Sequence, residues 1–89
     1  EEFKDWLDNL KDLIGRAKIQ ARIKRLAEGN PGNIKCVGGK ITEMKIDFGP
    51  GYRIYYTKQE DMIYLLLIGG SKRTQAKDIQ MAKLLIKNL

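Results

Sequence analysis

The sequence predicts a small α+β domain in which two helices precede four antiparallel strands and a third helix closes the chain. Apolar residues recur at helical spacing up to about Gly29, the period becomes two after residues 30–33, and helical spacing returns after Thr74. At 89 residues the chain has room for one domain, residues 1–89. The economical architecture is a small sheet with the helices packed on one face.

Two helices are expected at the N-terminal end. The first carries one apolar stripe at i, i+3, i+4 and i+7, made of Phe3, Trp6, Leu7 and Leu10. Gly15 ends or kinks this helix, and a second apolar stripe from Ala17 to Ala27 leads to Gly29 as a C-terminal cap. The short connection predicts an antiparallel helical hairpin.

The four strands are expected at residues 34–37, 41–48, 52–57 and 62–68, with turns at 38–39, 49–51 and 58–61. The last strand is a continuous apolar run, the pattern of a strand covered on both faces, so we expect it at the centre of the sheet. Ser71 and Thr74 are candidate caps for a closing helix through Ile86.

The Gly49-Pro50-Gly51 turn predicts a hairpin between the second and third strands. If Phe48 pairs with Tyr52, Asp47 faces Arg53 and Lys45 faces Tyr55. Strand alternation then gives the hairpin one apolar core face and one polar face.

Charge is unevenly distributed along the chain. The net charge is +6, but residues 1–15 carry five acids and two lysines, so that segment holds −3 and the remainder +9. A strongly basic body attracts polyanions, which makes RNA, DNA or an acidic protein the natural class of partner. The alternative is that the lysines serve solubility.

Several classes of protein are disfavoured by composition. With no histidine and the single Cys36, a zinc site or an internal disulfide is not expected, and Cys36 is expected to be a small buried strand residue. The longest apolar run falls far short of the ~20 residues of a membrane span, and no signal peptide is evident. We expect a cytoplasmic protein without metal or other cofactor and without membrane contact.

Cations and a tyrosine are expected to gather on the open face of the sheet: Lys45, Arg53, Tyr55, Lys72 and Arg73. Such a face could bind a phosphodiester and stabilise the phosphorane formed when RNA is cleaved by its own 2′-hydroxyl. This would be a nuclease-like arrangement without metal or histidine. The alternative is structural, with Arg53 paired to Asp47 and Tyr55 covering the sheet.

A second basic group lies on the exposed side of the second helix: Arg16, Lys18, Arg22, Lys24 and Arg25. The group is either a solvated helix face or a surface that holds a phosphate backbone.

Three segments together resemble the RelE/ParE toxin superfamily, and most closely the HigB-like addiction-module killer proteins. They are residues 23–30, the hairpin Phe48-Gly49-Pro50-Gly51-Tyr52-Arg53-Ile54-Tyr55-Tyr56, and residues 65–75 with Asp78, Ile79, Ala82 and Lys83. The family's toxins usually begin with a further strand. Nothing precedes Glu1 here, so that strand is expected to be missing.

The resemblance implies a bacterial toxin of a type II toxin-antitoxin module that inhibits translation as an mRNA interferase. Free of its antitoxin, such a protein enters the ribosomal decoding site and cleaves mRNA. The implied partners are therefore the cognate antitoxin, the ribosome and mRNA. Two alternatives remain open: a ParE-like, non-enzymatic inhibitor of DNA gyrase, and an inactive relative that binds only antitoxin or RNA.

The resemblance also implies roles for individual residues. Arg53 matches the arginine that follows Gly-Tyr, Arg73 or Lys72 matches the basic residue after the last strand, and Lys45 is the counterpart of lysines on the preceding strand. Arg53 and Arg73 would stabilise the phosphorane, while proton exchange would fall to Lys45, Lys72 or Tyr55. RNA contacts are expected from Arg22, Lys24, Arg25 and Lys77. Several nucleases of the superfamily carry tyrosine or histidine in the final helix, whereas residues 77–80 here read Lys-Asp-Ile-Gln.

Overall fold

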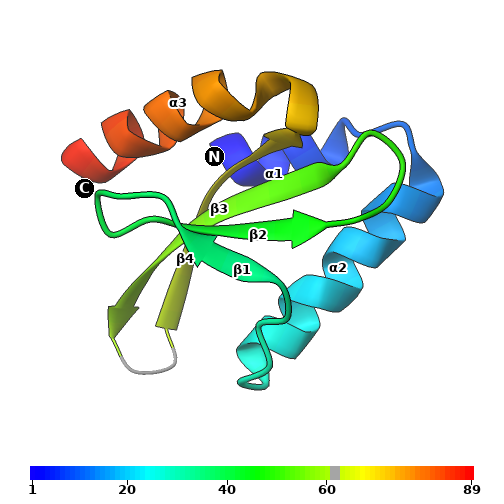
Figure 1. Ribbon diagram of the computed structural model, residues 1–89, viewed down its shortest axis with the longest axis horizontal. Coiled ribbons are helices and arrows are strands. Elements are labelled where there is room, and N and C mark those ends of the chain that lie inside the picture. The colour runs from blue at the N-terminus through cyan, green and yellow to red at the C-terminus, as the bar shows by residue number, and fades with distance from the viewer. Residues whose placement is uncertain (61–62) are drawn as a thin grey trace.

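The computed structural model describes residues 1–60 and 63–89 and confirms the α+β fold (Figure 1). In chain order the elements are α1 (Glu2–Asp8), α2 (Leu13–Ala27), β1 (Ile34–Cys36), β2 (Thr42–Ile46), β3 (Tyr52–Glu60), β4 (Ile63–Ser71), the 3₁₀ turn η1 (Lys72–Thr74) and α3 (Gln75–Lys87). The strands form one antiparallel sheet in the order β1-β2-β3-β4. Among the described residues, no helix is long and apolar enough to cross a membrane.

The second helix starts earlier than expected because Asp12 caps it. The Gly15 backbone N–H donates a hydrogen bond of 3.0 Å to Asp12 Oδ1, so Gly15 lies in the first turn of α2 rather than at a break. A side chain at position 15 would meet Asp12 and the Tyr52 ring at 2.6 Å. Gly15 therefore allows α2 to lie close to the start of β3.

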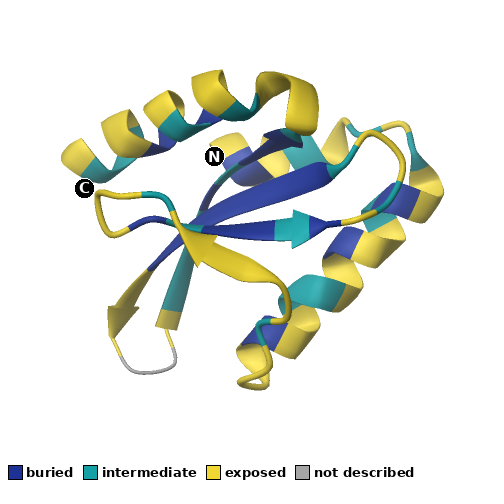
Figure 2. Ribbon diagram, viewed as in Figure 1, coloured by how far each residue is buried: buried dark blue, intermediate teal, exposed yellow. Residues whose placement is uncertain are grey.

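The helices cover both faces of the sheet, which corrects the expectation of one covered face. α1 and α2 contribute Phe3, Ile19 and Leu26 to a core with Met44 and Ile54. On the opposite face, Ala82 of α3 packs with Ile41, Tyr55 and Leu67 in a second core. Figure 2 shows β2 and β3 as the buried centre, with β1 exposed. The face expected to be open is therefore partly roofed by α3.

β4 lies at an edge of the described sheet, and its predicted central position is wrong. Its two faces are nevertheless covered as the apolar run indicated, because the Trp6 ring of α1 lies against Gly69 and Asp78 of α3 lies against Gly70. A continuous apolar run indicates that both faces of a strand are covered, but it does not indicate how many strands are hydrogen-bonded beside it. The predicted first residue of this strand, Met62, lies outside the described residues.

The hairpin between β2 and β3 has a longer loop than predicted. Ile46, Lys45 and Glu43 pair with Tyr52, Arg53 and Tyr55, a shift of two residues. The loop therefore runs over residues 47–51, with Gly49 and Gly51 at φ of 55° and 75°, a region that glycine adopts readily. Because the shift is even, every side chain keeps its predicted face.

Two further expectations are wrong. Residues 58–60, predicted as part of a polar turn, continue β3 to Glu60, and Asp61 lies outside the described residues. Cys36 is exposed and not buried, because β1 is the other edge strand of the described sheet and all three of its residues face solvent.

Candidate functional site

A cavity of about 330 Å³ lies on the α3 side of the sheet. Its volume is at the lower end of the range for ligand sites, roughly 300–1,000 Å³. It is lined from the loop before β1, from β1, β2 and β3, and from the first residue of α3: Asn33, Ile34, Lys35, Glu43, Lys45, Arg53 and Gln75. Three cations and one carboxylate thus face a common space.

Glu43 is the carboxylate, and it is 4% exposed. The Tyr55 hydroxyl donates to its Oε2 at 3.1 Å and the Gln75 amide donates to the same oxygen at 2.7 Å. The other carboxylate oxygen, Oε1, accepts no hydrogen bond from the described residues. Among those residues, Arg53 Nε is the one buried side-chain nitrogen or oxygen without a hydrogen-bond partner. Glu43 lines the cavity, and the two bonds to Oε2 hold its carboxylate in place.

Arg53 is buried beside Glu43, with 6% of the residue exposed. Its Nε lies 3.7 Å from Glu43 Oε2, an ion pair without a hydrogen bond, and one terminal nitrogen donates to the Gly51 carbonyl at 3.1 Å. A buried guanidinium nitrogen without an acceptor is costly unless a further acceptor binds there. Arg53 as a residue lines the cavity, and its positive charge suits an anionic ligand there.

The start of α3 is fixed firmly, which positions Gln75. The Thr74 hydroxyl accepts a hydrogen bond from the Ser71 N–H at 3.1 Å and donates to the buried carboxylate of Asp78. The Asp78 carboxylate lies directly against Gly70, where any side chain would collide with it. This contact holds the first turn of α3 against β4 and brings the Gln75 amide within reach of Glu43.

Tyr55 does not lie on an open surface, and its expected role in proton exchange with RNA is not supported by its position. The residue is 0% exposed beneath α3. Burial, and then the neighbouring carboxylate of Glu43, raise the pKa of the Tyr55 hydroxyl. The hydroxyl therefore keeps its proton and donates it in the hydrogen bond to Glu43.

The other expected catalytic residues divide into two groups. Lys45 pairs with Arg53 across the hairpin and lines the cavity. Lys72 and Arg73 are exposed in η1 and do not line it, although the Lys72 side chain and an Arg53 terminal nitrogen both lie close to Gly51. The structure therefore brings Lys45 and Arg53 together in the cavity. Lys72 lies outside the cavity, close to Gly51 of the same hairpin.

The expected RNA-binding residues are not gathered around the cavity. Lys77 is exposed on α3, and Lys24 and Arg25 are exposed on α2, which packs on the opposite face of the sheet. Arg22 is half-buried and donates to the Lys45 and Pro31 carbonyls at 2.8 and 3.1 Å. It therefore ties α2 to β2 and to the loop before β1.

Metal-ligating side chains do not cluster in the part of the chain that the structure describes: no group of three or more cysteine, aspartate and glutamate side chains is close enough to hold an ion.

The chain is 53% identical over 87 residues to an uncharacterized protein of Haemophilus influenzae, and the match covers 98% of this chain and 88% of that protein. The two proteins belong to one family. No family model and no solved structure matches the chain.

The sequence patterns did not indicate Glu43 and Gln75 as members of the site. The alternation of β2 places Glu43 on the same face as Lys45, but the predicted register sets Asp47 opposite Arg53, whereas the structure has Lys45 there and Glu43 opposite Tyr55. Gln75 carried no comparable signal, because its approach to Glu43 depends on how α3 packs across the sheet.

Proposed function

We propose that this protein is a toxin of a type II toxin-antitoxin module that inhibits translation by cleaving mRNA on the ribosome, in the manner of the RelE/ParE superfamily. The observation that carries the proposal is the juxtaposition, in one cavity, of the Glu43 carboxylate with Arg53, Lys45 and Lys35. A positioned base and fixed cations are what RNA cleavage by its own 2′-hydroxyl requires.

In the proposed reaction the Oε1 atom of Glu43 accepts the proton of the 2′-hydroxyl. The 2′-oxygen then attacks the adjacent phosphorus, the bond from phosphorus to the 5′-oxygen breaks, and Lys45 gives a proton to the departing 5′-oxygen. The products are a 2′,3′-cyclic phosphate and a 5′-hydroxyl end. The bonds from Tyr55 and Gln75 keep Glu43 in one orientation throughout.

Arg53 has the role of stabilising the phosphorane. Arg53 lines the cavity, so its guanidinium would attract a phosphoryl oxygen bound there, and among the described residues its buried Nε has no hydrogen-bond acceptor. This interaction would strengthen as negative charge accumulates in the transition state. Lys72, close to the same hairpin, would contact the neighbouring phosphate.

The charge of the whole chain supports a ribosomal target. Residues 16–89 carry +9, which favours association with an RNA-rich particle in the bacterial cytoplasm. It also favours silencing by an acidic antitoxin.

The proposal is tested by inducing the gene in bacteria and mapping transcript ends. We expect growth arrest together with new in-frame cuts in translated mRNA. We expect Glu43→Gln to lower the number of cuts by at least about a hundredfold, the usual loss when a general base is removed.

Asp47→Asn is the matched control, because Asp47 is an exposed carboxylate that follows the same strand and does not line the cavity. It should cut like the wild type. Growth arrest with DNA damage and intact transcripts would instead indicate a gyrase inhibitor, and no effect on growth or transcripts would indicate an inactive relative.

A further inference from the structure

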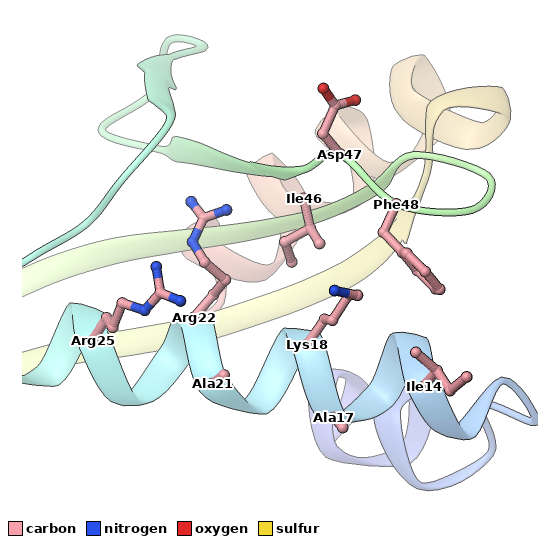
Figure 3. Close-up of a pocket in the computed structure, with 9 residues that line it drawn as sticks. All are labelled: Ile14, Ala17, Lys18, Ala21, Arg22, Arg25, Ile46, Asp47 and Phe48. Atoms are coloured by element: carbon pink, nitrogen blue, oxygen red, sulfur yellow. The ribbon is translucent and has the colours of Figure 1, made fainter.

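A second hollow of about 480 Å³ lies on the opposite face of the sheet, between α2 and the end of β2 (Figure 3). Its walls come from one face of α2 and from three consecutive residues of the β2–β3 hairpin: Ile14, Ala17, Lys18, Ala21, Arg22, Arg25, Ile46, Asp47 and Phe48. We call it the α2 groove. The residues of α2 span from position 14 to position 25, about 16 Å along a helix.

The α2 groove is apolar along its floor. Figure 3 shows Ile46 and Phe48 pointing toward α2, while Asp47 points away from it. Ala17 and Ala21 add only short side chains to the lining of the groove. At the start of the helix, Ile14 is 64% exposed and the adjoining Leu13 74% exposed. Large exposed apolar side chains beside a groove are typical of a protein interaction site.

The rim of the α2 groove is cationic. Lys18, Arg22 and Arg25 follow one another at i, i+4 and i+7 on α2. Within residues 1–60 and 63–89 none of the three lies in an ion pair. Lys18 lies over the Phe48 ring at 5.0 Å, and Arg22 donates to two carbonyls. The rim therefore offers positive charge that is not held in an ion pair by any carboxylate of the described residues, and Asp47, which also lines the groove, points away from α2 (Figure 3).

We propose that the α2 groove is the docking site of an acidic amphipathic helix from a partner protein. Apolar side chains of that helix would fill the floor between Ala17, Ala21 and Phe48, and its carboxylates would face Lys18 and Arg25. Charge complementarity favours an acidic partner, and the apolar floor with exposed Leu13 and Ile14 favours a polypeptide over an RNA backbone. The site is distinct from the Glu43 cavity, because the sheet separates them, and it does not depend on cleavage activity.

The test is a selection of helix-constrained 14-residue peptides, displayed as a library, against the intact chain. We expect the selected peptides to carry apolar residues at i, i+3 or i+4, and i+7, with glutamate or aspartate beside them. Backbone NMR shifts on binding should concentrate at Ala17, Ala21 and Phe48.

A matched pair of variants tests the charge. Arg25→Glu reverses a cation of the groove, whereas Lys24→Glu reverses the neighbouring exposed cation that does not line it. We expect the dissociation constant of the best acidic peptide to rise at least tenfold in Arg25→Glu and less than threefold in Lys24→Glu.

Four outcomes would overturn the proposal: a selection that yields no binder, binders that shift residues elsewhere, binders without acidic residues, or equal weakening by both variants. A single-stranded oligouridine probe is measured in parallel. Shifts at Ala17, Ala21 and Phe48 that are stronger with this RNA than with the peptides would also overturn it and assign the surface to nucleic acid.

Discussion

At the scale of single residues, the central feature is a buried carboxylate and a buried guanidinium that are incompletely paired. Glu43 and Arg53 are 4% and 6% exposed, yet their closest atoms stand 3.7 Å apart without a hydrogen bond. A protein that buried these charges for stability alone would pair them closely, since burying an ion without full compensation costs several kcal/mol. Both residues line the cavity, so their charges would act on a ligand bound there.

Gln75 is expected to act as a positioning residue for Glu43. In Gln75→Ala one of the two hydrogen bonds to Oε2 is lost, and a bond to a charged group contributes roughly 1.5–3 kcal/mol. Cleavage should therefore slow by about ten- to a hundredfold while the fold is kept. The measurement is the single-turnover rate on ribosome-bound mRNA. Gln80→Ala, an exposed position on the same helix, is the control. Equal rates in the two variants would remove Gln75 from the site.

Tyr52 and Asp12 predict a pH window of stability. The Tyr52 hydroxyl donates to Asp12 Oδ2 at 2.8 Å. Burial, and then this bond, raise the pKa of Tyr52 to about 12. The bond from the Gly15 N–H, and then that from Tyr52, lower the pKa of Asp12. Compared with the unfolded chain, the folded state therefore binds the Tyr52 proton more tightly and the Asp12 proton less tightly.

The free energy of unfolding should consequently decline as pH rises from about 10 toward 12, where the unfolded tyrosine ionises first. It should also decline in acid below about pH 4, where the Asp12 of the unfolded chain becomes protonated. Urea titrations at several pH values check both limbs. In Tyr52→Phe the decline of the free energy of unfolding at alkaline pH should be less steep. The decline that remains would come from Tyr55 and Tyr56, whose pKa values burial also raises. An alkaline limb as steep as that of the wild type would contradict this account.

Sequence patterns located Arg53 and Lys45 correctly because alternation along a strand decides the face on which a side chain lies. They missed Glu43 because register depends on the length of the loop, and the backbone of residues 47–51 forms a wider turn than Gly-Pro-Gly suggested. They misplaced Tyr55 because nothing local reports that a distant helix, α3, covers it. The sheet face on which a side chain lies can be predicted from the local sequence. Its burial and its contacts depend on elements that are distant in the sequence.

At the scale of elements, the junction between β4 and α3 determines the geometry of the site. Gly70 is in contact with the Asp78 carboxylate, which also accepts the Thr74 hydrogen bond, so three residues lock the first turn of α3 onto the strand. Gly69 makes the corresponding close contact with Trp6 of α1 on the other face. Two consecutive glycines thus let helices approach β4 from both sides.

Gly70→Ala is therefore expected to destabilise the fold and misplace Gln75. The added methyl group would collide with Asp78, and overpacking of this kind costs typically about 1–3 kcal/mol. For a chain of this size the midpoint of thermal unfolding should fall by roughly 4–8 °C per kcal/mol. Calorimetry of the variant checks this, with Ala76→Ser on the exposed side of α3 as the control. An unchanged midpoint in Gly70→Ala would show that the junction tolerates displacement.

The edge position of β4 illustrates what element patterns can and cannot predict. The apolar run from Tyr64 to Ile68 correctly indicated two covered faces, because α1 and α3 pack on either side. It did not indicate an edge, because the in-plane neighbours of a strand are set by topology. The predicted caps Ser71 and Thr74 do form the turn before α3, whereas the predicted break at Gly15 missed the Asp12 cap that starts α2.

At the scale of the whole molecule, the sheet divides the basic charge between two surfaces. Lys35, Lys45 and Arg53 line the cavity under α3, whereas Lys18, Arg22 and Arg25 line the α2 groove on the opposite face. A single count of +9 for the body of the chain conceals this division. Because the two surfaces are separate, the proposed RNA site and the proposed docking site would not compete for the same residues.

The most direct test of the central claim is cleavage of a ribosome-bound mRNA by the purified chain, followed by analysis of the ends. We predict 5′-hydroxyl and 2′,3′-cyclic phosphate ends, no cut where the nucleotide 5′ to the scissile phosphate is 2′-deoxy, and at least about a hundredfold slower cutting by Glu43→Gln than by Asp47→Asn. Two results would contradict the account: cleavage that persists at the 2′-deoxy position, or a cleavage rate of Glu43→Gln equal to that of the wild type.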